Sequence, residues 1–264
     1  MLVDSHCHLD RLNLDKYDQQ LASAIDAAQL RGVEKLLCVG ISTENRKKVV
    51  EIAEKYSCVV ASVGVHPLDV QEGLASVSDL VDWSQHDKVV ALGETGLDYH
   101  YGEEDRDLQR KSFITHLQAA KQARLPVIVH TRDARKDTID LIDHYGCHKN
   151  AGVLHCFTES VDMAKQAIDM NYLISFSGII TFRNAQALKE VAREIPLEHL
   201  LIETDSPYLA PVPYRGKPNE PQYVREVAEY LADLKGIPLS TLAEVTTENF
   251  YRLFPKAKDV TKAC

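Results

Sequence analysis

Long apolar runs and an export signal are both missing from this sequence. Hydrophobic residues make up 45% of its 264 positions. No segment, however, approaches the roughly 18 consecutive apolar residues that a membrane-spanning helix requires. The first residues also lack the basic head and extended apolar stretch of a signal peptide. We therefore expect a globular protein of the cytoplasm that does not act at a membrane.

An excess of positive charge is absent as well. Lys and Arg total 30 against 39 Asp and Glu, which gives a formal net charge of −9. This balance argues against a protein that coats nucleic acid non-specifically, because such binding relies on Lys and Arg to neutralise phosphates. A polyanionic substrate is still compatible with the charge, because bound metal ions can reverse the sign of the field at a site.

Paired cysteine motifs are the third absence. The six cysteines show no CxxC pair and no spacing typical of disulfides. Cys7, Cys38 and Cys156 fall within strand-like segments. We interpret them as small buried hydrophobic residues in a reducing compartment.

Short β-rich apolar segments occur eight times and alternate mostly with helical patterns. Strands are predicted at 2–9, 35–40, 59–67, 89–98, 126–132, 151–157, 172–178 and 200–207. Helices are predicted at 16–32, 44–56, 105–125, 135–145, 160–170, 185–193, 220–236 and about 240–253. This alternation, in a chain near the ~250 residues usual for the fold, predicts an α/β protein with a (β/α)₈ TIM barrel. The alternative is a doubly wound open sheet, but no GxGxxG follows the first predicted strand.

No linker or change of composition divides the chain. We find no Gly/Ser-rich segment, internal repeat or low-complexity region. We therefore predict a single domain over residues 1–264, in which residues 255–264 form a C-terminal tail. The segment 210–221 contains four prolines and is interpreted as a fixed loop after the last strand.

Polar residues interrupt the apolar strands close to their C-terminal ends. In a (β/α)₈ barrel these ends converge on one mouth, where active sites are built. Six residues are best placed to meet there: His6, His8, Glu94, His130, His155 and Asp205. Each alone has an ordinary structural explanation, but burying four imidazoles and two carboxylates together is too costly unless charges are paired or bind a metal. Because imidazole nitrogens and carboxylate oxygens are ligands of Zn²⁺ and Mn²⁺, the set predicts a metal centre.

The candidate ligands outnumber those that one tetrahedral ion needs. Two ions about 3.5–4 Å apart, bridged by one carboxylate, would use all six. Glu94 comes from a middle strand of the set and is the natural bridge, with a catalytic role. Asp205 could be both a ligand and the general base for a water whose pKa the ions lower. Asp4 has the same strand phase as His6 and His8, so we expect it one layer deeper, bonded to a ligating imidazole.

The other histidines outside the strands are given structural roles. Four of them fall in predicted helices or loops and are expected at the surface: His86, His100, His116 and His199. His144 and His148 have the i, i+4 spacing of a helical chelate, but Gly146 is expected to end the helix between them.

Nine segments follow one another in a recognisable order. They are DSHCHLD (4–10), GVHP (64–67), GETGLDYH (93–100), HTRDA (130–134), HCFTES (155–160), SGIITF (177–182), ETDSPYLAP (203–211), GKPNEP (216–221) and NFYRLF (249–254). Together they resemble the TatD family of metal-dependent deoxyribonucleases, which are amidohydrolase-like barrels. The resemblance covers the chain from Leu2 to about Phe254. The combination of HxH, GExGLD and ETDSPYLAP is highly specific, although each piece alone is not.

This resemblance implies a two-metal centre and a reaction. The ions would be Zn²⁺, Mg²⁺ or Mn²⁺, and the reaction would be hydrolysis of phosphodiester bonds in DNA, from a 3′ end. One ion would be held by His6, His8, Glu94 and Asp205, and the other by Glu94, His130 and His155.

Substrate contacts are predicted around the mouth. Three residues are assigned to substrate binding: His66, Arg132 and Arg183. Arg215 and Lys217 are further candidate phosphate contacts. Three aromatic residues could stack on an unpaired base: Tyr99, Phe157 and Tyr208. Because long duplex DNA requires a basic stripe that this acidic chain lacks, we expect single-stranded DNA or DNA ends as substrate. No obligate protein partner is evident.

Two other classes of function are compatible with such a barrel. One is a lactonase, amidase or deacylase on the same metal centre, since function depends on the site rather than the fold. Some amidohydrolase relatives bridge their metals with a carboxylated lysine at a strand end, and no lysine ends any of the eight predicted strands. The other class is a non-catalytic scaffold, which the complete set of candidate ligands argues against.

Overall fold

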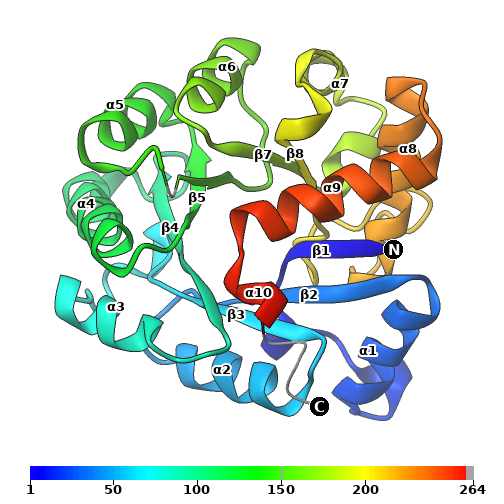
Figure 1. Ribbon diagram of the computed structural model, residues 1–264, viewed down its shortest axis with the longest axis horizontal. Helices are drawn as coiled ribbons and strands as arrows, with labels where there is room; N and C mark the ends of the chain where they lie inside the picture. Colours follow the sequence, from blue (N-terminus) through cyan, green and yellow to red (C-terminus); the bar gives the residue numbers. More distant parts are fainter. Residues whose placement is uncertain (150, 260–264) are drawn as a thin grey trace.

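Eight parallel strands form a barrel, as predicted (Figure 1). The computed structural model describes residues 1–149 and 151–259. The strands are β1 (Leu2–Cys7), β2 (Val33–Val39), β3 (Val59–Val63), β4 (Val89–Asp98), β5 (Val127–Arg132), β6 (Gly152–Leu154), β7 (Leu173–Phe176) and β8 (Leu200–Ile202). They pair in chain order. All eight predicted strands are present, although several are shorter than predicted.

The barrel closes where its first strand meets the segment after its last. Cys7 and Ser206 form an isolated parallel bridge. The N–H of Asp205 donates to the carbonyl of His6 over 2.9 Å, and the N–H of His8 donates to the carbonyl of Ser206 over 2.8 Å. This seam fixes the two ends of the predicted ligand set against each other.

Most of the helices surround the barrel on its outside, and the last two lie across one of its ends (Figure 1). They are α1 (Leu21–Leu30), α2 (Arg46–Lys55), α3 (Val77–Ser84), α4 (Arg106–Ala123), α5 (Arg135–Tyr145), α6 (Val161–Asp169), α7 (Gln186–Glu194), α8 (Val224–Lys235), α9 (Leu239–Leu253) and α10 (Lys256–Asp259). The eight predicted helices are present, whereas α3 and α10 were not predicted. Within the described part of the chain, no helix combines the length and apolarity needed to cross a bilayer.

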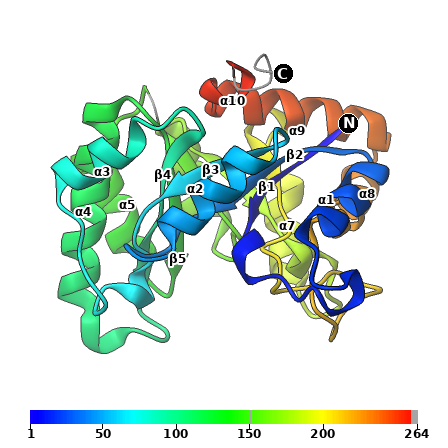
Figure 2. The same ribbon diagram turned by 90° about the horizontal axis from the view of Figure 1, so that it is seen from below.

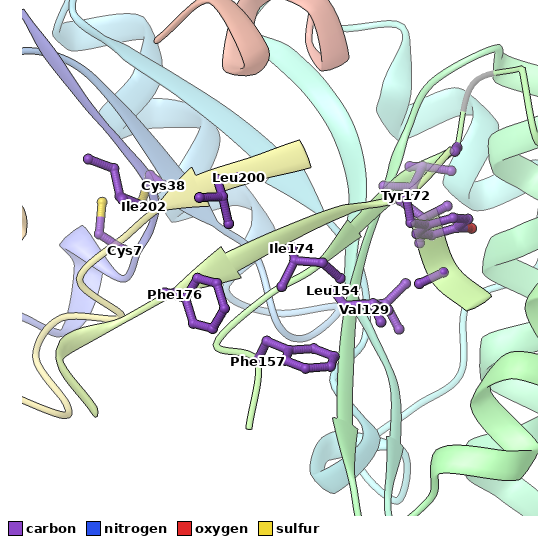
Figure 3. Packing of buried hydrophobic residues seen from close by; sticks show 14 of the residues in the cluster. Cys7, Cys38, Val129, Leu154, Phe157, Tyr172, Ile174, Phe176, Leu200 and Ile202 are labelled. Atoms are coloured by element: carbon purple, nitrogen blue, oxygen red, sulfur yellow. The ribbon is translucent and has the colours of Figure 1, made fainter. Parts of the chain in front are cut away.

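The strands bury side chains on both faces, which explains their nearly continuous apolar sequences. In β3, Val59 and Ala61 belong to the large cluster shared with the helices. Val60, between them, belongs to a separate cluster that takes at least one residue from every strand and therefore fills the barrel interior. Figure 3 shows part of the first cluster, in which Phe157 and Phe176 pack edge to face.

The C-terminal helices close the end of the barrel at which the strands begin. Phe250 and Phe254 are fully buried and pack into the interior cluster, together with Ala257 of α10. Figure 2 shows α9 and α10 across the end where β1 starts. The segment predicted as a C-terminal tail, 255–264, therefore includes a packed helical turn, and its residues 260–264 lie outside the described part.

Candidate metal centre

The six predicted ligands lie together at the opposite end of the barrel, where the strands finish. His6 and His8 come from the end of β1, Glu94 and His130 from β4 and β5, and His155 and Asp205 from the segments after β6 and β8. All but His6 line a cavity of about 700 Å³, and His6 is fully buried beside them.

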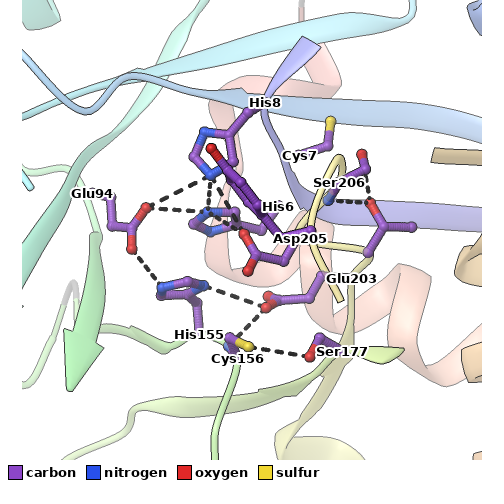
Figure 4. Close-up of polar contacts among 12 residues, drawn as sticks. His6, Cys7, His8, Glu94, His155, Cys156, Ser177, Glu203, Asp205 and Ser206 are labelled. Atoms are coloured by element: carbon purple, nitrogen blue, oxygen red, sulfur yellow. Dashed lines mark hydrogen bonds and ion pairs between the residues drawn. The ribbon is translucent and has the colours of Figure 1, made fainter. Parts of the chain in front are cut away.

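One group of atoms gathers at the seam (Figure 4). The Nε2 atoms of His6 and His8 are 3.4 Å apart. Asp205 Oδ1 lies 3.7 Å from the first and 3.4 Å from the second. Glu94 Oε2 lies 3.3 Å from His6 Nε2 and 4.0 Å from His8 Nε2. Four side chains from three strand ends thus point at one small volume.

A second group gathers around the other oxygen of Glu94. His155 Nε2 is 2.7 Å from Glu94 Oε1. His130 Nδ1 and His66 Nε2 are each 3.3 Å from the same oxygen. Glu94 therefore stands between two clusters and presents one oxygen to each.

Two left-handed backbone turns aim side chains into the cavity. Asp205 has a φ of 57° and Cys156 has a φ of 42°. Such conformations are uncommon outside glycine, and they concentrate at functional sites. Because the N–H of Asp205 is bonded to His6, the turn there places the carboxylate beside the β1 imidazoles.

Charge coupling keeps the carboxylates ionised. Burial acts to raise the pKa of Glu94, but the imidazoles around it, His155 first, hold that pKa well below its usual range. Burial also opposes ionisation of Asp205, yet the hydrogen bond and charge of His8 lower its pKa. The pKa of His6 is lowered by burial and then by His155, so its imidazole is neutral and can donate a lone pair.

Two further carboxylates support the histidines of the second group. Asp98 Oδ2 lies 3.0 Å from His130 Nε2, and Glu203 Oε1 lies 3.3 Å from His155 Nδ1. In metal sites, such partners fix the tautomer and direction of a ligating ring. Neither residue was given this role from sequence. The spacing of Glu203 in the sequence could have indicated this role, because Glu203 precedes Asp205 by two residues, just as His6 precedes His8.

The donor atoms fit divalent ions. Ligands about 2.1 Å from one tetrahedral ion lie about 3.4 Å from each other. The separations among His6, His8, Glu94 and Asp205 run from 3.3 to 4.0 Å, close to this value. His155 Nε2 is buried and makes no hydrogen bond, despite its closeness to Glu94. A cation beside these atoms would give that nitrogen a ligand bond in place of the hydrogen bond that it lacks.

His66 was predicted to bind substrate, and its ring lies directly beside Glu94. Its Nδ1 accepts a hydrogen bond from the N–H of Leu68 over 3.1 Å. In the neutral ring the proton is then on Nε2, the atom that faces Glu94. His66 is therefore a hydrogen-bond donor into the site, because Nε2 has no free lone pair for a metal.

Asp4 does not make its predicted contact with an imidazole. Its Oδ1 accepts from the N–H of Thr204 over 2.9 Å and from that of His6 over 3.3 Å, and its Oδ2 bonds the Thr204 hydroxyl over 2.6 Å. The register of β1 shifts between Asp4 and Cys7, so the period-two phase argument fails there. Burial raises the pKa of Asp4 to about 8. Its role is to join the backbones at the seam.

The predicted substrate contacts divide into two sets. Arg132 and Tyr208 line the cavity. Arg183 is exposed outside it, as are Arg215, whose guanidinium lies over Phe182, and Lys217. Phe157 is buried in the core. The Tyr99 hydroxyl donates to Asp137 away from the cavity.

The assignment of His116 to the surface is wrong. The residue is fully buried on α4. Its Nδ1 donates to the carbonyl of Ser112 over 2.7 Å, and its Nε2 accepts from the N–H of Val65 over 3.1 Å. Burial lowers its pKa to about 4, so the neutral ring anchors the segment that carries His66. His144 and His148 belong to none of the candidate metal groups among the described residues.

A comparison with models of known protein families identifies the family of this chain. The model of the family described as TatD related DNase matches residues 3–255. The chain belongs to the TatD family. The resemblance read from the nine sequence segments is thereby confirmed.

Individual TatD relatives match over nearly the whole chain. YcfH of Escherichia coli, an uncharacterized metal-dependent hydrolase, is 48% identical over 253 residues, covering 96% of this chain and 95% of its own. YabD of Bacillus subtilis, with the same description, is 42% identical over 258 residues, covering 96% and 99%. The crystal structure of YJJV, a TatD homolog from Escherichia coli, superposes with a TM-score of 0.87 at 28% identity, covering 96% and 98%.

Proposed function

We propose that this TatD-family chain is a metal-dependent hydrolase that cleaves phosphodiester bonds of DNA, acting 3′ to 5′ on single strands or ends. The observation that carries the proposal is the position of Glu94. One of its oxygens faces His6 and His8, and the other faces His130 and His155. This is the arrangement expected of a carboxylate that bridges two cations.

Two divalent ions, zinc, magnesium or manganese, are the proposed cofactors. When bound, they would lower the pKa of a water and neutralise the oxygens of a phosphate. The residues that would hold them are His6, His8, Glu94 and Asp205 for one, and Glu94, His130 and His155 for the other. Glu203 and Asp98 would keep the rings of His155 and His130 turned toward the ions.

Asp205 is the proposed general base. Its side chain is 14% exposed, so it can reach a water in the cavity while remaining bonded to the seam. Its lowered pKa leaves it ionised at neutral pH. As the water oxygen bonds to phosphorus and the bond to the leaving oxygen breaks, Asp205 would accept the proton.

His66 and Arg132 are the proposed substrate contacts. The Nε2 proton of His66 points into the site and can be donated to a phosphate oxygen. Arg132 lines the same cavity and adds positive charge to an otherwise acidic chain. Arg183 has no part in this proposal, because it lies outside the cavity.

A panel of substrates with Mg²⁺, Mn²⁺ or Zn²⁺ tests the function. It should contain 3′-labelled single-stranded DNA, duplex DNA, RNA, an aryl phosphodiester, lactones and N-acyl amides. We expect cleavage of the single strand and the aryl phosphodiester, loss of both with EDTA, and up to two metal equivalents by elemental analysis. Cleavage of lactones or amides alone would replace the nuclease with the alternative function.

We also propose a cytoplasmic location. Cys7 and Cys38 are register partners in β1 and β2, and both are buried and free. Free thiols that lie side by side are typical of a reducing compartment. Cell fractionation with an antibody tests this, and recovery with exported proteins would contradict it.

A further inference from the structure

Two exposed tyrosines stand at the rim of the cavity without a packing role. Tyr101 is 66% exposed and Tyr208 is 47% exposed. Both line the cavity, together with Arg132 and Arg11. A planar aromatic ring that is exposed beside a cavity offers a surface on which an unpaired base can stack.

The Tyr101 pair consists of Tyr101 and Arg132. The guanidinium carbon of Arg132 lies 4.6 Å from the centre of the Tyr101 ring. Asp98 Oδ1 accepts from the N–H of Tyr101 over 2.8 Å, while Oδ2 of the same carboxylate contacts His130. The backbone that carries the ring is therefore anchored to a carboxylate that also contacts the metal centre.

The Tyr208 pair consists of Tyr208 and Arg11. Both side chains line the cavity, beside His8 and Asp205. The N–H of Tyr208 donates to the carbonyl of Asp205 over 2.9 Å. Its ring lies edge-on to His8, with centroids 6.0 Å apart. This ring is also held directly beside the metal centre.

The two pairs are related by the barrel itself. Tyr101 and Arg132 follow or end β4 and β5, and Tyr208 and Arg11 follow β8 and β1. In a barrel with its eight strands in chain order, these positions are four strands apart and face each other across the mouth. Each tyrosine comes three residues after an aspartate of the site. The six candidate ligands lie between the pairs.

We propose that the Tyr101 pair and the Tyr208 pair are two nucleotide-binding subsites, one on each side of the bond that is cleaved. Each tyrosine stacks on an unpaired base, and each arginine contacts a flanking phosphate, so the strand crosses the mouth over the metal centre. Aromatic stacking tolerates any base but requires that the base be unpaired. The inference rests on the proposed nuclease function and deepens it, because it explains how an acidic chain holds a single strand.

Nearby residues make a matched control available. Tyr99 is two residues from Tyr101 and has an arginine, Arg106, over its ring at 4.4 Å, yet it does not line the cavity. Tyr99→Ala removes a ring with the same kind of neighbour but no proposed base. Tyr101→Phe and Tyr208→Phe keep the stacking surface and remove only the hydroxyl.

The test compares kcat/KM for a single-stranded oligonucleotide with that for a base-free aryl phosphodiester. Tyr101→Ala and Tyr208→Ala should each lower the oligonucleotide-to-diester ratio about 10-fold, chiefly through KM, because stacking on one aromatic ring is worth about that factor. The Phe variants and Tyr99→Ala should keep the wild-type ratio. An oligonucleotide with an abasic nucleotide on one side of the cleaved bond should lower the ratio of the wild type about 10-fold. With this substrate, only one of the two Ala variants should no longer differ from the wild type.

Two results separate this inference from the function on which it rests. If the wild type cleaves the diester but no oligonucleotide, the nuclease proposal and the subsites both fail. If it cleaves oligonucleotides, but the Ala variants leave the ratio unchanged or one abasic site cancels both variants equally, the subsites alone are overturned.

Discussion

The two ends of the barrel are built from the same eight strands, yet one end is filled with apolar side chains and the other is lined with polar ones. Where the strands begin, Phe250, Phe254 and Ala257 fill the interior with apolar side chains. Where they finish, imidazoles and carboxylates surround a cavity, and His155 Nε2 is left without a hydrogen bond. In TIM barrels the first end serves stability and the second serves function, so substitutions at the two ends should affect different measurements.

The largest expected effect is on turnover at the polar end. Asp205→Asn should reduce kcat by about 10³-fold, because general-base catalysis commonly contributes 10²- to 10⁴-fold. The free energy of unfolding of the metal-free protein should change little. Asp82→Asn, on the exposed surface of α3, is the control and should behave as wild type. Near-normal turnover of Asp205→Asn would show that the base is another residue.

At the apolar end, the largest effect should be on stability. Phe250→Ala should lower the free energy of unfolding by about 3–5 kcal/mol, because it leaves a cavity in the closed end of the barrel. Phe250→Leu, which retains most of the volume, should cost about 1 kcal/mol. Chemical denaturation measures both. The kcat of the folded fraction should be unchanged, and a parallel loss of kcat would contradict the separation of the two ends.

His116 anchors the segment that carries His66 at the polar end, and it should make stability depend on pH. Burial holds its folded-state pKa at about 4, below the ordinary value of 6.5. Below pH 6.5 the unfolded chain binds a proton that the folded one does not, so the free energy of unfolding falls as pH drops toward 4. The contribution is about 3 kcal/mol over that window. His116→Gln should show a shallower decrease between pH 6.5 and 4, and identical slopes would disprove the assignment.

The smallest expected effect concerns the support of a ligand. Glu203→Gln should weaken metal binding by about 10- to 100-fold, as is usual when the partner of a ligating imidazole is changed. Calorimetric titration of the metal-free protein measures it. Glu220→Gln is the matched control, because Glu220 is a buried carboxylate that bonds Tyr17 instead of a ligand. Equal weakening in both variants would point to general destabilisation.

The architecture could be predicted because short apolar strand segments and longer amphipathic helical segments are both recognisable locally in the sequence. Each predicted strand overlaps an observed one. Helix α3 was missed because it is only eight residues long, although Ser76 and Asp79 form the capping box that begins it. The short turn of α10 was missed for a different reason: it is held by packing of Ala257 into the barrel, which no local pattern records.

The candidate ligands could be located from the sequence because the strand ends converge. The carboxylates that contact the ligating rings could not be located in this way. Asp98 reaches a ring on the neighbouring strand, and Glu203 reaches a ring that follows β6, two strands away. Both contacts depend on the register of the strands. Asp4 was given the wrong partner because the strand irregularity after it is invisible in sequence. His116 was placed at the surface because its helix was recognised without the face that it buries. The roles of the ligands themselves are still predictions for the experiments above.

The seam between β1 and the segment after β8 has a consequence for synthesis of the protein. It joins partners such as Asp4 and Thr204, which are 200 positions apart in the chain. A ribosome releases His6 and His8 first, and Asp205 only about 200 residues later. The nascent chain therefore has no complete set of candidate ligands, and hydrolytic activity is delayed until the last strand emerges.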